Sequence, residues 1–407
     1  MDTVNSLLYG QGLILLVYQI YLVSLPWEIY SATHNPTWAL WAFIFEMIPY
    51  IGLGLVGGLL ADRFHRQRLL VGLNLTLFLP ILLLMMWHYH PSWHVLVPLA
   101  GFVMGSSLAS VLPITESCFP LLTSAERLLQ MNARWEAINY VTGFLGPLIG
   151  GSLLAATGYV EILVVQGILV LTAVVSLYRA QSLKNLGLPQ RVTSFFLTRD
   201  IVCFLPRHPQ LRWGLIFSGF VNFALATYSG LLVILLRLHL HLSIAQIGLW
   251  LGIANGFPYL VNLFIQHAPA GIIRVAAHRP LRLMAIGVVV QGLGVLWVSW
   301  VSIPWLVVVG QALYLGGVTI YTTFWRALRQ QQTDARWIGR ISGLSRSSAY
   351  TGSVLGGIMG LWLLHYFAVP QITRVAGFIV MGFGLFSLLM LKPRFPWLTV
   401  TNRRISH

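Results

Sequence analysis

The chain has 407 residues, of which 57% are hydrophobic and only 9% are charged, whereas about a quarter of the residues in a soluble domain are charged. So few charged side chains cannot cover a water-soluble fold of this length, which excludes a soluble enzyme and predicts a surface that mostly faces lipid. The net charge of +15 does not indicate nucleic-acid binding, because the basic residues form short clusters between long apolar stretches.

Twelve apolar segments follow one another along the chain, each long enough to cross about 30 Å of hydrocarbon at about 1.5 Å per residue. They lie at about 5–30, 38–60, 69–88, 94–118, 133–157, 160–179, 212–236, 244–268, 281–301, 304–325, 338–365 and 372–391. Backbone polar groups in lipid must be satisfied within their own segment, so helices are expected. The sequence therefore predicts an all-α membrane protein with twelve transmembrane helices.

Lysine and arginine orient these helices, because basic residues are retained on the cytoplasmic side of a membrane. With the first residue in the cytoplasm, all but two of the 25 basic residues fall in cytoplasmic segments, and the exceptions are Arg237 and Arg374. We therefore expect a multi-pass protein of the cell membrane with both termini cytoplasmic.

The longest polar segment divides the chain into an N-terminal six-helix bundle (1–180), a cytoplasmic central loop (181–211) and a C-terminal six-helix bundle with a short tail (212–407). The halves also share two short patterns. Pro49 and Tyr50 recur as Pro258 and Tyr259, and Tyr140, Gly146 and Gly150 recur as Tyr350, Gly356 and Gly360. Such a repeat is typical of transporters built from two parallel halves.

The segment between the second and third spans carries the strongest local motif, Gly58-Leu59-Leu60-Ala61-Asp62-Arg63-Phe64-His65-Arg66-Gln67-Arg68. It resembles the loop motif G-x-x-x-D-R-x-G-R-x-R of the major facilitator superfamily, from which it departs at His65. The resemblance implies the major facilitator fold and a conformational latch formed by Gly58, Asp62, Arg63, Arg66, Arg68 and Glu116. Asp62 would face the start of span 11, and Arg66 would pair with Glu116. The alternative is cytoplasmic anchoring by the arginines plus one structural aspartate.

A second motif lies in span 5 and comprises Gly143, Gly146, Pro147, Gly150 and Gly151. It resembles the G-x-x-x-G-P-x-x-G-G motif of drug:proton antiporters. Glycines allow close helix approach and the proline bends the helix. With the preceding Glu126-Arg127 and Asn132-Ala133, the chain resembles the macrolide-efflux-like branch of the superfamily, which implies export. The alternative is the small-residue packing common in membrane helices.

Carboxylates inside the membrane are the candidates for proton coupling. A charged side chain at mid-bilayer costs at least about 2.5–3.5 kcal/mol, so one that persists lines a cavity or carries protons. Glu46, about two turns into span 2, is the deepest and the first candidate; Glu136 in span 5 is the second, and Glu28 near the outside is the third. The alternative role for Glu46 is a structural hydrogen bond to a neighbouring helix.

The resemblance also implies a substrate cavity lined by spans 1, 4, 7 and 10. Candidate lining residues are Tyr18, Gln19, Asn222, Tyr228, Gln311 and Tyr314; their alternative role is hydrogen bonding between helices. The external His88, His90 and His94 have no adjacent carboxylate or thiol, so a solvated loop is expected there and no metal site. Without a Walker A sequence, ATP hydrolysis is not expected.

These observations predict a monomeric secondary transporter, without a cofactor or catalytic residue, that exports hydrophobic drug-like or macrolide-like molecules by alternating access in exchange for protons. Its partners would be the small-molecule substrate, protons and the lipid bilayer. Two alternatives stay open: uptake or facilitated diffusion of a metabolite, and a membrane sensor that transports nothing.

Overall fold

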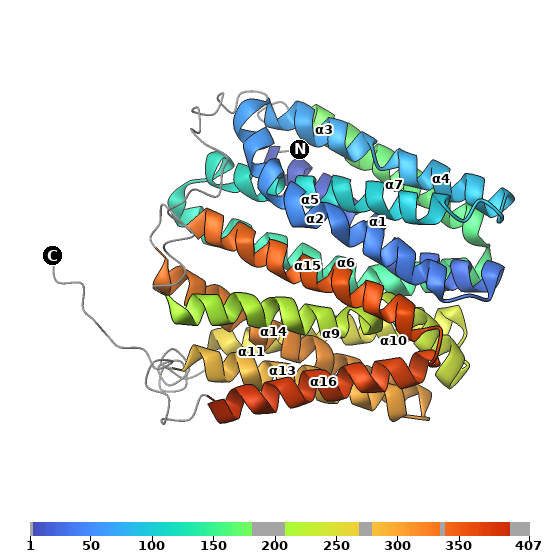
Figure 1. The fold of residues 1–407 in the computed structure, drawn as a ribbon. Coiled ribbons are helices and arrows are strands. Elements are labelled where there is room, and N and C mark those ends of the chain that lie inside the picture. Colours follow the sequence, from blue (N-terminus) through green and yellow to red (C-terminus); the bar gives the residue numbers. More distant parts are fainter. Residues whose placement is uncertain (1–2, 181–207, 268–278, 334–337, 391–407) are drawn as a thin grey trace.

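The computed structural model describes residues 3–180, 208–267, 279–333 and 338–390, and within these ranges the chain is helical apart from short turns (Figure 1). The first half contains α1 (Thr3–Thr33), α2 (Thr37–Arg63), α3 (Arg66–Leu75), α4 (Phe78–Tyr89), α5 (Leu96–Leu122), α6 (Ala125–Ala156) and α7 (Tyr159–Arg179). The second half contains α9 (Pro209–Leu240), α10 (Ile244–Asn255), α11 (Phe257–His267), α13 (Pro280–Trp300), the 3-10 turn η3 (Pro304–Leu306), α14 (Val307–Gln332), α15 (Ile338–Leu363) and α16 (Val369–Met390).

The prediction of twelve membrane crossings is confirmed. Ten segments of the described chain are long and apolar enough to cross a membrane, and α2 and α15 complete the set. Two crossings are broken helices, α3 with α4 and α10 with α11. The breaks at Thr76 and Gly256 lie just before Pro80 and Pro258, because a proline lacks the amide hydrogen and its ring displaces the carbonyl one turn earlier.

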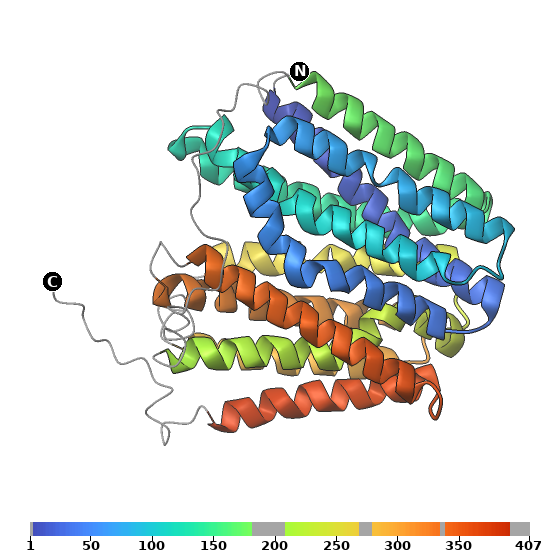
Figure 2. The ribbon, with the colours of Figure 1, turned by 45° about the horizontal axis from the view of Figure 1, so that its top comes forward.

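Each half has its own tightly packed helix pairs. In the first half α2 lies along α5, and α1 contacts α6 and α7; in the second half α13 contacts α14 and α16, and α9 lies along α15. Figures 1 and 2 show the first half (blue to green) beside the second half (lime to red). The halves meet mainly where α2 packs on α15 and α6 packs on α10, and α9 also contacts α1 and α2.

The short turns after α1, α6, α9 and α15 lie at one end of the molecule (Figure 1). In the orientation that the arginine distribution predicts, this end would face the outside, and it is called the external end below. The opposite end is called the cytoplasmic end. Most of the predicted central loop falls outside the described residues, at 181–207.

Glycines bring the two halves into close contact near the external end. A Cβ atom on Gly151 of α6 would lie only 2.6 Å from the carbonyl oxygen of Ile244 and 2.9 Å from Cα of Gly248, both on α10. On the α2–α15 side, a Cβ atom on Gly357 would lie 2.5 Å from the side chain of Ile44. The contact of Gly151 is with backbone atoms and needs glycine, because any side chain there would push the helices apart, whereas the neighbour of Gly357 is a side chain.

Candidate functional site

Glu46 lies on α2 at the interface with α1. It is about 14 Å along the helix from Thr37, at about 1.5 Å per residue, and only 3% of its surface is exposed. The hydroxyl of Tyr18 on α1 donates a hydrogen bond of 2.6 Å to Oε1 of Glu46. The backbone carbonyl of Glu46 lies directly against Gly105 of α5, where a Cβ atom could not fit. The α2–α5 contact therefore fixes the helix and directs the carboxyl group toward α1.

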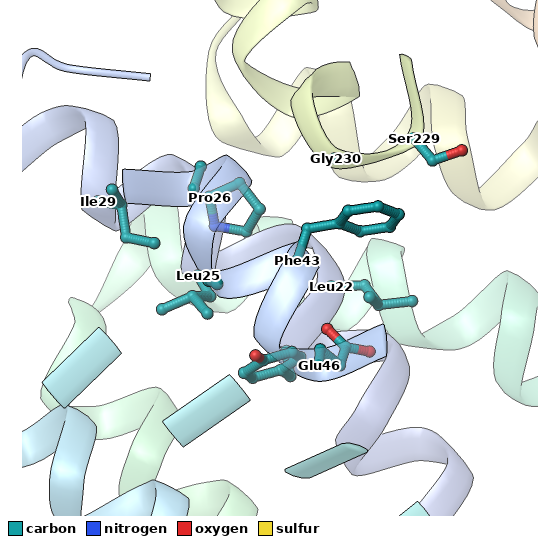
Figure 3. Close-up of a pocket in the computed structure, with 11 residues that line it drawn as sticks. Leu22, Leu25, Pro26, Ile29, Phe43, Glu46, Ser229 and Gly230 are labelled. Atoms are coloured by element: carbon teal, nitrogen blue, oxygen red, sulfur yellow. The ribbon is translucent and has the colours of Figure 1, made fainter. Parts of the chain in front are cut away.

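A small cavity adjoins this carboxyl group (Figure 3). Its walls include Tyr21, Leu25 and Pro26 of α1, Phe43 and Glu46 of α2, and Ser229 and Gly230 of α9. The volume of about 40 Å³ accommodates a few water molecules, since one needs roughly 10–15 Å³. A drug-sized ligand needs at least about 300 Å³. The cavity is therefore suited to water and protons and is too small to be the substrate pocket.

Tyr21 contributes a second polar group to the same cavity. Its hydroxyl is buried and has no hydrogen-bond partner among the described residues, and its ring stacks on that of Tyr18 with centroids 6.2 Å apart. Buried hydroxyl groups are nearly always hydrogen-bonded, to protein or to ordered water. Tyr18, Tyr21 and Glu46 thus form a polar strip along an otherwise apolar seam.

Glu28 lies apart from this strip, at the external end of α1. Its carboxylate pairs with Nδ1 of His88 at 3.0 Å, and the side chains are 16% and 33% exposed. His94 stacks on Trp38, with ring centroids 4.8 Å apart. Two of the three histidines expected in a solvated loop are therefore held by contacts to α1 and α2, which the sequence pattern alone did not indicate.

Glu136 and Glu116 are exposed near the cytoplasmic end of α6 and α5. The charges that act on the carboxylate of Glu116 are those of Arg346, Arg326 and Glu136. Arg326 and Arg346 belong to α14 and α15, so charged groups of opposite sign face each other across the two halves. The structure does not bring Glu28, Glu46 and Glu136 together.

The predicted latch is described only in part. Arg66 is half-buried and Arg68 is exposed at the start of α3, whereas the side chains of Gly58, Asp62 and Arg63 lie outside the described residues. The latch, including the pair of Arg66 with Glu116, therefore stays a prediction.

Gln67 is a residue of this motif that sequence reasoning missed. It is buried, and its side-chain amide donates hydrogen bonds to the carbonyl groups of Leu177, Tyr178 and Ala180, at 2.9, 2.9 and 3.2 Å. These carbonyls lie at the C-terminal end of α7, where the last turn lacks the partners that a continuing helix would supply, although the carbonyl of Leu177 also accepts a 3.2 Å hydrogen bond from the amide of Ala180. The side-chain amide of Gln67 thus ties the start of α3 to the C-terminal end of α7.

The span 5 motif packs α6 in two directions. Gly146 lies against Gln19 of α1 in a contact that leaves no room for a larger residue, and Gly150 lies in tight contact with Ile20 of the same helix. Gly151 faces α10, as described above, and the carbonyl oxygen of Pro147 lies against Gly248. Gly143 has more space, because a Cβ atom there would be 3.9 Å from Asn255. The motif therefore joins α6 both to its own half and to the other half.

Three of the cavity candidates cluster in the second half. The hydroxyl of Tyr228 donates a 2.6 Å hydrogen bond to Oε1 of Gln311, and both residues are buried. Tyr314 packs edge-on against Tyr228, with ring centroids 5.1 Å apart, and its hydroxyl lies 3.4 Å from that of Ser229 in the Glu46 cavity. Tyr228 and Gln311 join helices, whereas Tyr314 approaches the seam between the halves.

The remaining candidates lie elsewhere. Tyr18 belongs to the Glu46 strip, Gln19 packs against Gly146, and the side-chain amide of Asn222 donates a 2.9 Å hydrogen bond to the carbonyl of Ser218 in its own helix.

Comparison with known proteins identifies the family. The family description "Major Facilitator Superfamily" matches residues 7–357, which is most of the chain. The chain belongs to this superfamily. As a member of the superfamily with twelve helical crossings, it is a multi-pass membrane transporter and not an enzyme.

Curated superfamily relatives include an exporter. The chain is 27% identical over 385 residues to "Enterobactin exporter EntS" of Citrobacter koseri (strain ATCC BAA-895 / CDC 4225-83 / SGSC4696), an alignment that covers 89% of this chain and 84% of the relative. It is 25% identical over 359 residues to "Uncharacterized MFS-type transporter YfiS" of Bacillus subtilis (strain 168), covering 85% and 82%. The relative named as an exporter is compatible with an efflux branch of the superfamily.

Solved structures of other transporters share the fold. A bacterial homologue of the iron transporter ferroportin, in an inward-facing state, superposes with a TM-score of 0.72 at 17% identity, covering 95% of this chain and 97% of the other. The nucleoside transporter NupG superposes with a TM-score of 0.77 at 12% identity, covering 96% and 100%. At such low identities these likenesses support the fold alone.

Proposed function

We propose that this transporter exports hydrophobic small molecules of the drug or macrolide type, driven by protons that enter through Glu46. The observation that carries the proposal is a buried carboxyl group at the seam between the halves. Glu46 and Tyr18 belong to the first half, whereas Ser229 and Gly230 of the second half close the same cavity. If the halves rock against each other, α9 leaves this cavity and the access of the carboxyl group changes.

Alternating access then links proton movement to transport. The two bundles, residues 1–180 and 212–407, move as units, with both chain termini in the cytoplasm. With the external seam closed, Glu46 exchanges its proton with the cytoplasm; with the external seam open, it takes up a proton from outside. Tyr18 and Tyr21 supply the hydroxyl groups along which water passes the proton. Substrate crosses in the opposite sense through the space between the bundles, and one monomer suffices for the cycle.

The direction of transport is supported by the relatives named as enterobactin exporters. Their similarity makes enterobactin-like molecules a second substrate class, to be assayed beside dyes and macrolides. Export also agrees with the glycine-proline motif of α6, which resembles that of antiporters.

Transport into inside-out vesicles tests the proposal. A difference of one pH unit is about 1.36 kcal/mol per proton, which supports about tenfold accumulation of a neutral substrate for one exchanged proton. We expect uptake of a fluorescent dye or a macrolide to rise with the imposed gradient. Equal uptake with and without the gradient would exclude coupling and favour facilitated diffusion.

Three glutamine variants then assign the coupling group. Glu46→Gln is expected to lose gradient-driven accumulation while downhill exchange continues. Glu136→Gln tests the second candidate. Glu161→Gln, at an exposed carboxylate in the first turn of α7, is the matched control and is expected to behave as the wild type. Failure of the wild type to move any tested compound in either direction would favour the non-transporting sensor.

A further inference from the structure

Arg237 joins the two halves at the external end. It lies in the last turn of α9. The ring contacts and hydrogen bonds given next are all with α1, which belongs to the other half. Its guanidinium carbon is 4.1 Å from the ring centroid of Trp27 and 5.1 Å from that of Tyr30. Its Nη1 donates hydrogen bonds of 2.6 Å to the hydroxyl of Ser31 and 3.3 Å to the carbonyl oxygen of Trp27.

We propose that these four residues, called the Arg237 clamp below, form the external gate of the transporter. The inference rests on the proposed alternating-access function. The clamp lies directly above the Glu46 cavity: Arg237 is about 12 Å along α9 from Ser229, at about 1.5 Å per residue. On α1 the cavity-lining Pro26 is next to Trp27. While the clamp is formed, water and solutes from outside do not reach Glu46.

The chemistry of the clamp suits a contact that breaks in every cycle. Its partners are two aromatic faces, a hydroxyl group and a carbonyl group, all of them neutral. The nearby carboxylate of Glu28 is engaged by His88 at 3.0 Å. A guanidinium group held by neutral partners returns to water more readily than one in a buried ion pair. Cation–π attraction acts only within about 6 Å of the ring centroid. A small separation of α1 and α9 therefore abolishes the attraction between Arg237 and the two aromatic rings.

Arg374 is an external arginine that the clamp does not include, and it serves as a comparison for Arg237. It is the other basic residue that the charge distribution places outside. Its Nε donates a 3.1 Å hydrogen bond to the carbonyl oxygen of Ser299 on α13, which belongs to the same half. Of the two external arginines, Arg237 therefore crosses the seam, whereas this contact of Arg374 stays within one bundle. Arg374 is a natural control for the loss of an external positive charge.

The accessibility of a reporter cysteine tests the clamp. The background is Cys118→Ser with Cys203→Ser, and the reporter is Ser229→Cys, in the cavity beneath the clamp. Right-side-out vesicles are treated from outside with a charged, membrane-impermeant maleimide. A second reporter, Ser92→Cys in the exposed external turn before α5, normalises the reaction and verifies which face is outside. No substrate or proton gradient is applied, so the outcome does not depend on whether Glu46 carries protons.

Arg237→Gln and Trp27→Leu are each expected to raise the labelling rate of the reporter by about fivefold or more, because each removes contacts to a charged group. Arg374→Gln should leave it at the wild-type rate. Ser31→Ala removes only the 2.6 Å hydrogen bond and should raise the rate by a smaller factor, which keeps the test valid if a larger change impairs folding. Wild-type labelling in both Arg237→Gln and Ser31→Ala, or equal increases in Arg237→Gln and Arg374→Gln, would overturn the gate and assign Arg237 to lipid anchoring.

Discussion

Replacing Gly151 by alanine places a methyl group in the seam where α6 and α10 meet. The new Cβ atom would be 2.6 Å from the carbonyl oxygen of Ile244, and 2.9 and 3.1 Å from Cα and N of Gly248. All three are backbone atoms, so no side chain can rotate away and the helices themselves must separate. Overpacking of this kind costs about 1–3 kcal/mol, which converts to a roughly 5- to 150-fold shift away from the arrangement with a closed external seam.

Distance measurements between spin labels give the assay. Labels on Thr157 and His241, in the exposed external turns after α6 and α9, report the separation of the halves. Gly151→Ala is expected to move the distance distribution toward a longer, open-outside population. Gly143→Ala is the matched control from the same motif, because its Cβ atom would meet Asn255 at an ordinary 3.9 Å. An unchanged distribution in Gly151→Ala, or the same shift in both variants, would refute the packing argument.

Three further changes probe the site and its frame. Tyr18→Phe removes the 2.6 Å hydrogen bond to Glu46. Because a hydrogen bond to a charged group contributes about 1.5–3 kcal/mol, gradient-driven export should slow by roughly tenfold or more while downhill exchange persists. Gradient-driven export at the wild-type rate would contradict this. His88→Ala removes the partly exposed contact of 3.0 Å with the carboxylate of Glu28. Such a contact contributes at most about 1 kcal/mol, so thermal unfolding in detergent should shift by less than about 3 °C and transport should be retained. Trp325→Ala removes a side chain that is 4% exposed and should cost about 3–5 kcal/mol, whereas Trp362→Ala, at a 57% exposed site, should leave the unfolding temperature nearly unchanged.

The helices were predictable because the membrane imposes a simple rule on composition. Long apolar segments separated by arginine clusters can only be spanning helices. Ten of the twelve lie within four residues of their predicted bounds, whereas α6 begins eight residues earlier than predicted and α14 ends seven residues later. The breaks at Thr76 and Gly256 were not predicted. Both precede a proline, yet Pro26 and Pro147 lie inside continuous helices. Whether a proline interrupts a helix depends on neighbouring packing, which a single sequence does not contain.

The candidate site could be proposed from the sequence as a list of residues, but its geometry could not. Depth along the chain singled out Glu46, because a carboxylate far from either membrane face is costly. Its partner Tyr18 lies on another helix, and the pairing follows only from how α1 crosses α2. The same holds for the pair of Glu28 with His88, which are 60 positions apart. Arg237 carried a usable signal, since it breaks the cytoplasmic bias of the basic residues.

Proton movement coupled to downhill substrate flux tests the central proposal most directly. Vesicles containing the purified transporter and a luminal pH dye are given a substrate gradient without a proton gradient. We expect the wild type to move protons opposite to the substrate, and Glu46→Gln to move substrate at a comparable rate with no change in luminal pH. Proton movement that persists in Glu46→Gln would contradict the assignment of Glu46 as the coupling group.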